Sequence, residues 1–128
     1  MASRLYTLNV TTASDGTATV YIPSCDSTAG DYIDGDWTIE SIVYTKTDFA
    51  SGVDFAITIT ATGENVWVEN DVNASKTVYP VAYAYDTTGT VTTAVRSLTL
   101  AKSSLKFAIT SGGSAKTGTF KVRLVSAD

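Results

Sequence analysis

Histidine is absent from this chain, and cysteine, methionine and proline are scarce, at one, one and two residues. Without histidine there can be no Ser-His-Asp triad, no Cys-His pair and no histidine metal site. With Cys25 as the only cysteine, the chain can form neither an internal disulfide nor a cysteine zinc cluster. These absences exclude the commonest catalytic and structural metal centres.

Charge is also limited. Charged residues make up 17% of the chain, and nine Lys and Arg stand against thirteen Asp and Glu, for a net charge of −4. Phosphate contacts need a basic surplus, so we expect no nucleic-acid partner. No run of eighteen apolar residues occurs, so we expect no membrane span. Residues 1–10 lack the pattern of a signal peptide, and we expect the protein to be made and folded in cytoplasm.

Threonine and serine are abundant, with 22 and 13 residues among 128. Threonine is β-branched and suits the pleated surface of a sheet, whereas helix-favouring residues are scarce. The length is that of one ordinary domain. We therefore predict a single all-β domain over residues 1–128.

Alternation with a period of two locates the strands. In residues 53–62, apolar Val53, Phe55, Ile57 and Ile59 alternate with smaller or polar residues, which is typical of a strand with one buried face. Similar runs predict up to nine strands, at about 4–11, 17–23, 37–46, 53–61, 65–69, 77–85, 95–100, 104–110 and 118–125. This spacing predicts an antiparallel, jelly-roll-like β-sandwich. The expected core is Leu8, Val10, Val20, Ile22, Ile39, Phe55, Ile57, Ile59, Phe107, Ile109, Phe120, Val122 and Leu124.

Turn residues separate these runs. Asp15-Gly16 predicts a hairpin between the first two strands, and the 111–114 loop predicts a hairpin between the last two. Pro80 lies inside a predicted strand, so that strand should be an edge strand or bulged. The loop over residues 24–36 has room for one short helical turn at most.

Two loops are candidate ligand sites. Asp31, Asp34 and Asp36 surround Gly35 and are the best metal candidate, but their spacing is not that of an EF-hand and no Glu closes the loop. The 113–118 segment has the glycines and lysine of a phosphate loop in the wrong order, and a strand follows where a helix is needed. We expect a solvated turn and a hairpin connection, with no metal and no cofactor.

The remaining catalytic candidates are carboxylates and one thiol. A carboxylate pair could hydrolyse glycosides, and the candidates are Asp48, Asp54, Glu64, Glu69 and Asp71. Cys25 has no cationic neighbour in sequence to lower its pKa, and Asp26 would raise it. Such scattered carboxylates are ordinary in an acidic protein, so we expect no catalytic residue and no enzyme.

The aromatic group at the middle of the chain is the best interface candidate. Tyr79, Val81, Tyr83 and Tyr85 share one strand parity, and no charged residue occurs over 77–85. Together with Trp67, these residues could pack in the core, stack sugars, or contact another subunit or partner. We expect Trp67, Tyr79, Val81, Tyr83 and Tyr85 to contribute to a contact with another subunit or a partner.

Several segments resemble a known group. The chain contains Ser51-Gly-Val-Asp-Phe-Ala-Ile-Thr, Tyr79-Pro80 and the closing stretch 104–124, with Gly112-Gly113, Lys116 and Gly118-Thr-Phe120. This order is similar to that of small β-rich virion proteins of tailed bacteriophages, from about residue 4 to residue 125. The 24–36 loop is longer and more acidic than that pattern. The resemblance implies structural motifs and no catalytic residues.

The resemblance implies a non-enzymatic virion protein, in the first place a capsid decoration or cement protein that binds the major capsid shell. We also expect a homodimer or homotrimer, because an uncharged strand with two apolar faces is best covered by another copy. The alternatives are a carbohydrate- or receptor-binding module of a phage tail or fibre, a tail or connector protein, and a small hydrolase.

Overall fold

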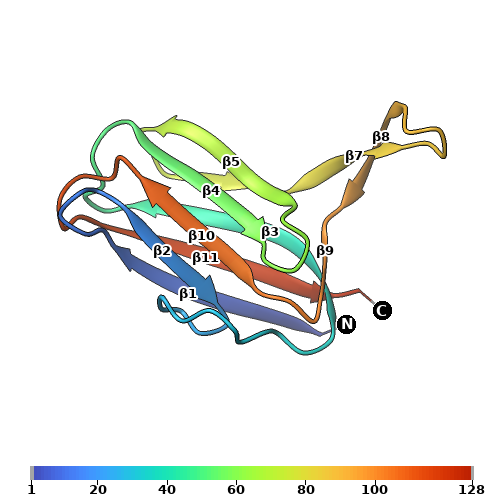
Figure 1. Ribbon diagram of the computed structural model, residues 1–128, viewed down its shortest axis with the longest axis horizontal. Helices are drawn as coiled ribbons and strands as arrows, with labels where there is room; N and C mark the ends of the chain where they lie inside the picture. The colour runs from blue at the N-terminus through green and yellow to red at the C-terminus, as the bar shows by residue number, and fades with distance from the viewer. Residues whose placement is uncertain (1, 128) are drawn as a thin grey trace.

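The computed structural model describes residues 2–127 and contains only strands within that range, with no helix (Figure 1). The strands are β1 (Ser3–Thr11), β2 (Ala18–Ile22), β3 (Asp36–Lys46), β4 (Val53–Ile59), β5 (Asn65–Val72), β6 (Lys76–Val78), β7 (Val81–Tyr85), β8 (Val91–Ser97), β9 (Thr99–Ala101), β10 (Leu105–Thr110) and β11 (Thr117–Ser126). The predicted all-β class is confirmed.

Each predicted strand range coincides with an observed strand, and two ranges cover two strands each. The 77–85 range is divided into β6 and β7 by Tyr79 and Pro80. The 95–100 range contains the end of β8 and most of β9, so the first four residues of β8 were missed. The break at Pro80 has a simple cause, because proline has no N–H to donate to a neighbouring strand.

The strands form a two-layered sandwich. With β7, β8 and β9 set aside, the other eight strands lie in the orders β1-β11-β3-β6 and β2-β10-β4-β5. The chain passes from one sheet to the other at every connection among these eight except that from β4 to β5. Two sheets joined in this way have the jelly-roll topology. The predicted jelly-roll-like sandwich is therefore confirmed.

Both hairpins predicted at the chain ends are wrong. β1 pairs with β11, and β2 pairs with β10, so the Asp15-Gly16 turn and the 111–116 loop each connect strands of different sheets. The two loops lie against each other, with the Gly112 amide donating to the Gly16 carbonyl at 2.9 Å. Thr12 donates its hydroxyl to the Gly113 carbonyl at 2.6 Å. The turn residues mark where the chain changes direction, but they do not determine which strands pair.

The core lies between the two sheets and contains all thirteen residues predicted for it. In β4, Val53, Phe55, Ile57 and Ile59 point inward, and the intervening residues are half-buried on the outer face. An aromatic cluster fills the middle of the sandwich, with Phe55 and Phe120 edge-on at 5.0 Å between ring centroids. Other core residues were not predicted, among them Tyr44, Phe49, Trp67 and Leu100. The sandwich thus has a complete core without any contribution from β7 and β8.

Candidate interaction surface

The β7–β8 hairpin projects from the sandwich as an arm, which we define as residues 81–97 (Figure 1). It leaves at the end of the sandwich where β1 begins and β11 ends. The strands before and after it, β6 and β9, both pair with the same strand, β3, at Ile42 and Thr38 respectively. Pro80 and Leu98 are buried at the two roots, and the Ile39 amide donates to the Leu98 carbonyl at 3.0 Å. The arm is therefore rooted at both ends in a central part of the sandwich.

A compact turn closes the tip of the arm. One Asp86 carboxylate oxygen accepts hydrogen bonds from the Thr88 amide at 2.9 Å, the Thr88 hydroxyl at 2.7 Å and the Thr90 amide at 3.0 Å. The Gly89 amide donates to the Asp86 carbonyl, and Gly89 has a φ of 82°, which a glycine adopts without strain. These bonds, that of the Thr88 hydroxyl first, lower the pKa of Asp86. The tip is held by its own hydrogen bonds.

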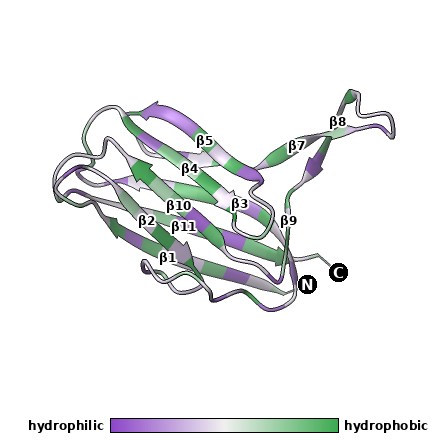
Figure 2. Ribbon diagram, viewed as in Figure 1, coloured by the Kyte–Doolittle hydropathy of each residue, from purple (hydrophilic) through white to green (hydrophobic). Residues whose placement is uncertain are grey.

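One face of the arm is apolar and uncovered. Tyr83 lies opposite Val95, and Tyr85 lies opposite Val91. Residues directly opposite each other in antiparallel strands lie on the same face of the sheet. These four side chains and Val81 are between 53% and 67% exposed, and we call these five residues the apolar arm face. Figure 2 shows hydrophobic residues along β7, although the arm lies away from the core.

Four of the five predicted interface residues lie at this surface. Val81, Tyr83 and Tyr85 belong to the apolar arm face, and Tyr79, at the root of the arm, is 69% exposed. Val91 and Val95 belong to the same face but were missed. Val91 lies outside the predicted strand range 95–100, whereas Val95 is the first residue of that range. A signal that could have identified β8 is the shared strand parity of Val91 and Val95, which follow the Thr88-Gly89 turn.

The prediction that Trp67 contributes to an interface is wrong, because its side chain is only 6% exposed. It lies on β5 opposite Ile57 and packs edge-on against Phe55 at 5.3 Å between ring centroids. The register of β4 and β5 shifts between Ile57 and Thr58, so that Val66 and Trp67 are both buried although they are consecutive. A bulge of this kind breaks the alternation on which the sequence prediction depends.

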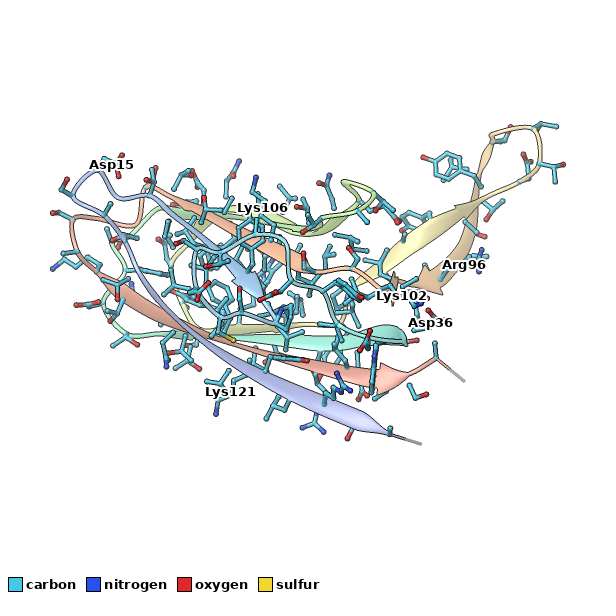
Figure 3. All side chains as sticks on the ribbon, turned by 60° about the horizontal axis from the view of Figure 1, so that its bottom comes forward. Asp15, Asp36, Arg96, Lys102, Lys106 and Lys121 are labelled. Atoms are coloured by element: carbon cyan, nitrogen blue, oxygen red, sulfur yellow. The ribbon has the colours of Figure 1, made fainter. Side chains whose placement is uncertain are left out.

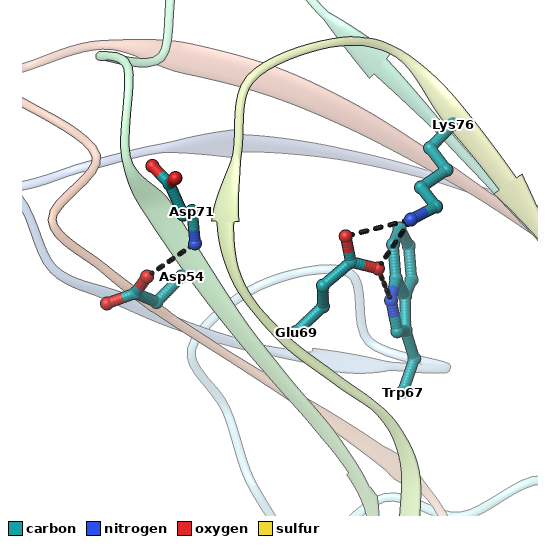
Figure 4. A network of polar contacts seen from close by, with 5 residues as sticks. All are labelled: Asp54, Trp67, Glu69, Asp71 and Lys76. Carbon is teal, nitrogen blue, oxygen red and sulfur yellow. Dashed lines mark hydrogen bonds and ion pairs between the residues drawn. The ribbon is translucent and has the colours of Figure 1, made fainter.

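The predicted carboxylates make structural contacts (Figure 4). Glu69 accepts hydrogen bonds from the Trp67 indole at 3.0 Å and forms an ion pair with Lys76 at 2.8 Å. The Lys76 hydrogen bond, followed by that of Trp67, lowers the pKa of Glu69. Asp54 accepts a hydrogen bond from the Asp71 amide at 2.9 Å. A general acid in glycoside hydrolysis needs a raised pKa, so the environment of Glu69 is the opposite of what that role requires.

The other two predicted carboxylates, Asp48 and Glu64, lie in loops, whereas Asp54, Glu69 and Asp71 lie on strands. Asp48 accepts hydrogen bonds from the Thr117 amide and from the Thr117 hydroxyl, the latter at 2.9 Å, and these bonds lower the pKa of Asp48. Glu64 accepts a hydrogen bond from the Thr62 hydroxyl at 3.2 Å in the turn between β4 and β5. Asp48 therefore links the loop between β3 and β4 to the start of β11, and Glu64 stabilises the turn between β4 and β5.

The loop of Asp31, Asp34 and Asp36 is held by its apolar neighbours. Ile33 is buried, and the Trp37 indole donates to the Asp34 carbonyl at 2.7 Å. Within residues 2–127, no three acidic or cysteine side chains lie together as a metal site would require. Cys25 is an exposed residue, but the protein around its thiol removes part of the surrounding water, and this desolvation, followed by the charge of Asp26, raises the pKa of the thiol. A raised pKa lowers the thiolate fraction on which cysteine reactivity depends.

A shallow depression of about 300 Å³ lies where the arm meets the sandwich. Its lining includes Tyr83 and Tyr85 from β7, Arg96 from β8 and Glu64 from the turn between β4 and β5. Figure 3 shows Arg96 near the base of β8. Arg96 lies opposite Ala82, on the face of the arm opposite to Tyr83 and Val95. The two faces of the arm therefore differ, with one uncharged and the other charged at its base.

Comparison of the chain with protein-family models and with curated protein sequences finds no match. In the part of the chain that the structure describes, no helix is long and apolar enough to cross a membrane.

Proposed function

We propose that this chain is a non-enzymatic structural protein of a tailed-phage virion, and specifically a capsid decoration protein that binds the major capsid shell. The observation that carries the proposal is the arm, a hairpin with an exposed, uncharged apolar face on a sandwich that already has a complete core. Exposed apolar patches of this kind are typical of protein–protein contacts. The resemblance of the sequence to small virion proteins supplies the assembly in which such a contact would serve, a capsid shell.

The remaining surface supports a binding role over a catalytic one. Glu69 and Asp48 hold strands and loops together, and hydrogen bonds lower the pKa of both carboxyl groups. The sandwich presents the arm at a fixed place, because β6 and β9, which flank the arm, both pair with β3. A contact element held at a fixed place loses less entropy on binding than a free segment would.

The test is the number of copies in the particle, measured by quantitative mass spectrometry of purified virions. We expect hundreds of copies, because a decoration protein follows the repeat of the shell. A dozen copies or fewer would contradict the decoration role and support a tail or connector protein. Co-sedimentation with undecorated capsids tests shell binding directly, with Tyr85→Lys as the weakened variant and Tyr32→Lys, an exposed tyrosine in the 24–36 loop, as the matched control.

One observation favours a second candidate, a carbohydrate-binding module of a tail or fibre. The lining of the depression includes Tyr83 and Tyr85 as well as Arg96 and Glu64, and aromatic rings can stack against sugars. Glycan-array binding that is lost in Tyr83→Ala, without affinity for capsids, would favour this alternative. Trp67 has no part in this version because it is buried.

A further inference from the structure

The arm is a separate two-stranded sheet, and this makes its exposed state unusual. Within residues 2–127, β7 pairs only with β8, so the arm has no third strand. An isolated two-stranded hairpin is at best marginally stable in water, and further strands or packing on its apolar face are needed for stability. The sandwich supplies neither, because it contacts the arm mainly at its roots. The arm therefore needs a covering surface from outside its own chain.

The apolar arm face is large enough to hold such a contact by itself. Its five residues and the neighbouring Tyr79 are each more than half exposed. Because an aromatic side chain can bury roughly 150–250 Å², the six residues together leave on the order of 700 Å² uncovered. A standard protein–protein interface takes about 800 Å² from each partner. The uncovered area thus has the size of one side of a stable interface.

The chemistry of the face favours a second copy of the chain over an independently folded partner. Between Tyr79 and Val95, the only charged residue is Asp86, which lies at the tip and not on the face. Interfaces between identical subunits are the most apolar class, whereas separately folded partners meet through surfaces about as polar as the rest of the protein. The chain carries a net charge of −4, so two copies repel each other least where neither presents a charge.

We propose that the arms of two copies pack face to face and form a homodimer, with Tyr83 and Val95 near the centre of the contact. A surface that meets its own copy about a two-fold axis closes at two subunits. This proposal deepens the proposed function, since it rests on the arm as the assembly contact and identifies the occupant. Docking on the shell then takes place through the dimer, whose paired sandwiches bind with two contacts in place of one.

The experiment is sedimentation equilibrium of the full chain with two pairs of variants. Val95→Lys on the arm is matched by Val68→Lys on β5, because these valines are 56% and 52% exposed. Tyr83→Lys is matched by Tyr32→Lys, at 62% and 56% exposure. We expect the wild-type protein to sediment at twice the 13.5 kDa mass of the chain. Each arm variant should raise the dimer dissociation constant at least tenfold, and neither control should change it.

Two outcomes overturn the proposal. One is a wild-type protein that stays monomeric at about 100 μM, far above the dissociation constants of stable dimers. The other is a dimer whose dissociation constant is the same in the arm variants as in the controls. Circular dichroism of each variant checks that the β signature is intact.

A cross-link provides a second readout that does not depend on weakening the contact. In a Cys25→Ser background, Val95→Cys should form an arm-to-arm disulfide under mild oxidation, and Val68→Cys should not. A cross-link that forms equally in both variants contradicts face-to-face arms. Binding to purified capsids is measured separately. A monomer that binds capsids would refute the dimer but not the proposed function. A dimer that does not bind capsids would refute the proposed function but not the dimer.

Discussion

Tyr44 shows how an individual residue can be placed for packing at the expense of its polar atom. Its ring lies 4.7 Å from Phe55 and 5.2 Å from Phe120, measured between ring centroids, in the aromatic cluster. Its hydroxyl is buried and has no hydrogen-bond partner among the described residues. Burial raises the pKa of Tyr44 to about 12, because the phenolate is even more costly to bury than the phenol.

The first prediction concerns this hydroxyl. Tyr44→Phe should increase the free energy of unfolding by about 1 kcal/mol, because it removes a desolvated donor that is not satisfied and keeps the ring. Urea unfolding followed by circular dichroism measures the difference. A loss of stability of similar size would mean that the hydroxyl has a partner, such as a bound water, that stabilises the fold.

The second prediction concerns Glu69 and pH. Lys76 and Trp67 hold the pKa of Glu69 below its ordinary value of 4.5 in the folded protein. The contact therefore stabilises the fold above pH 4.5, and this stabilisation is lost as the pH falls through the lowered pKa. Because the pair is partly exposed, the contribution is below about 1 kcal/mol.

Comparison with Glu69→Gln isolates this contribution. The wild-type protein should be the more stable of the two at pH 7, and the difference should disappear in acid once Glu69 is protonated. Urea unfolding at a series of pH values gives the measurement, with Glu64→Gln in the β4–β5 turn as the control. A difference that persists unchanged in acid would contradict the pH-dependent ion pair.

At the scale of elements, the arm depends on its tip and its two roots. Asp86 organises the tip through three hydrogen bonds, and the tip lies at the end of the arm away from the sandwich (Figure 1). Opening of such a hairpin is local, because few buried contacts hold it. The arm can therefore change its order without unfolding the sandwich.

Asp86→Ala tests that independence. Hydrogen exchange at the Thr88 and Thr90 amides should become faster, because both lose their acceptor, and the unfolding midpoint of the sandwich should stay unchanged. Asp26→Ala is the matched control, since Asp26 accepts the Thr28 amide at 2.7 Å in a similar turn away from the arm. If the arm variant lowers the global midpoint, the arm and the sandwich are one cooperative unit.

The elements could be predicted where one face is buried, and their pairing could not. The alternation from Val53 to Ile59 locates β4 because every second side chain points into the core. The turn residues around Gly16 are the same whether a chain reverses within one sheet or crosses to the other, so they could not reveal that β1 pairs with β11. Trp67 was misplaced because a bulge in β5 makes two consecutive residues face inward.

For the candidate site, the sequence indicated the parity of Tyr79, Val81, Tyr83 and Tyr85 but not the projection of the arm. An uncharged run that alternates aromatic residues with alanine suits a buried strand and an exposed arm equally well. The difference arises from long-range contacts. β6 and β9 both pair with β3, so β7 and β8 between them do not pair with this strand.

At the scale of the whole molecule, a sandwich with a complete core carries an arm whose apolar face is exposed. The core includes residues from both sheets and none from the apolar arm face. Substitutions on that face should therefore affect assembly and leave folding almost unchanged. This separation suits a protein that must fold before it is built into a larger structure.

The most direct test of the central claim is hydrogen exchange of the free monomer, at high dilution, compared with that of the protein bound in its assembly. The account predicts that amides of β7 and β8 become protected on assembly and that the strand amides of the sandwich core change little. Protection that appears only over other surfaces, with the arm as exposed as in the free monomer, would contradict the arm as the assembly contact.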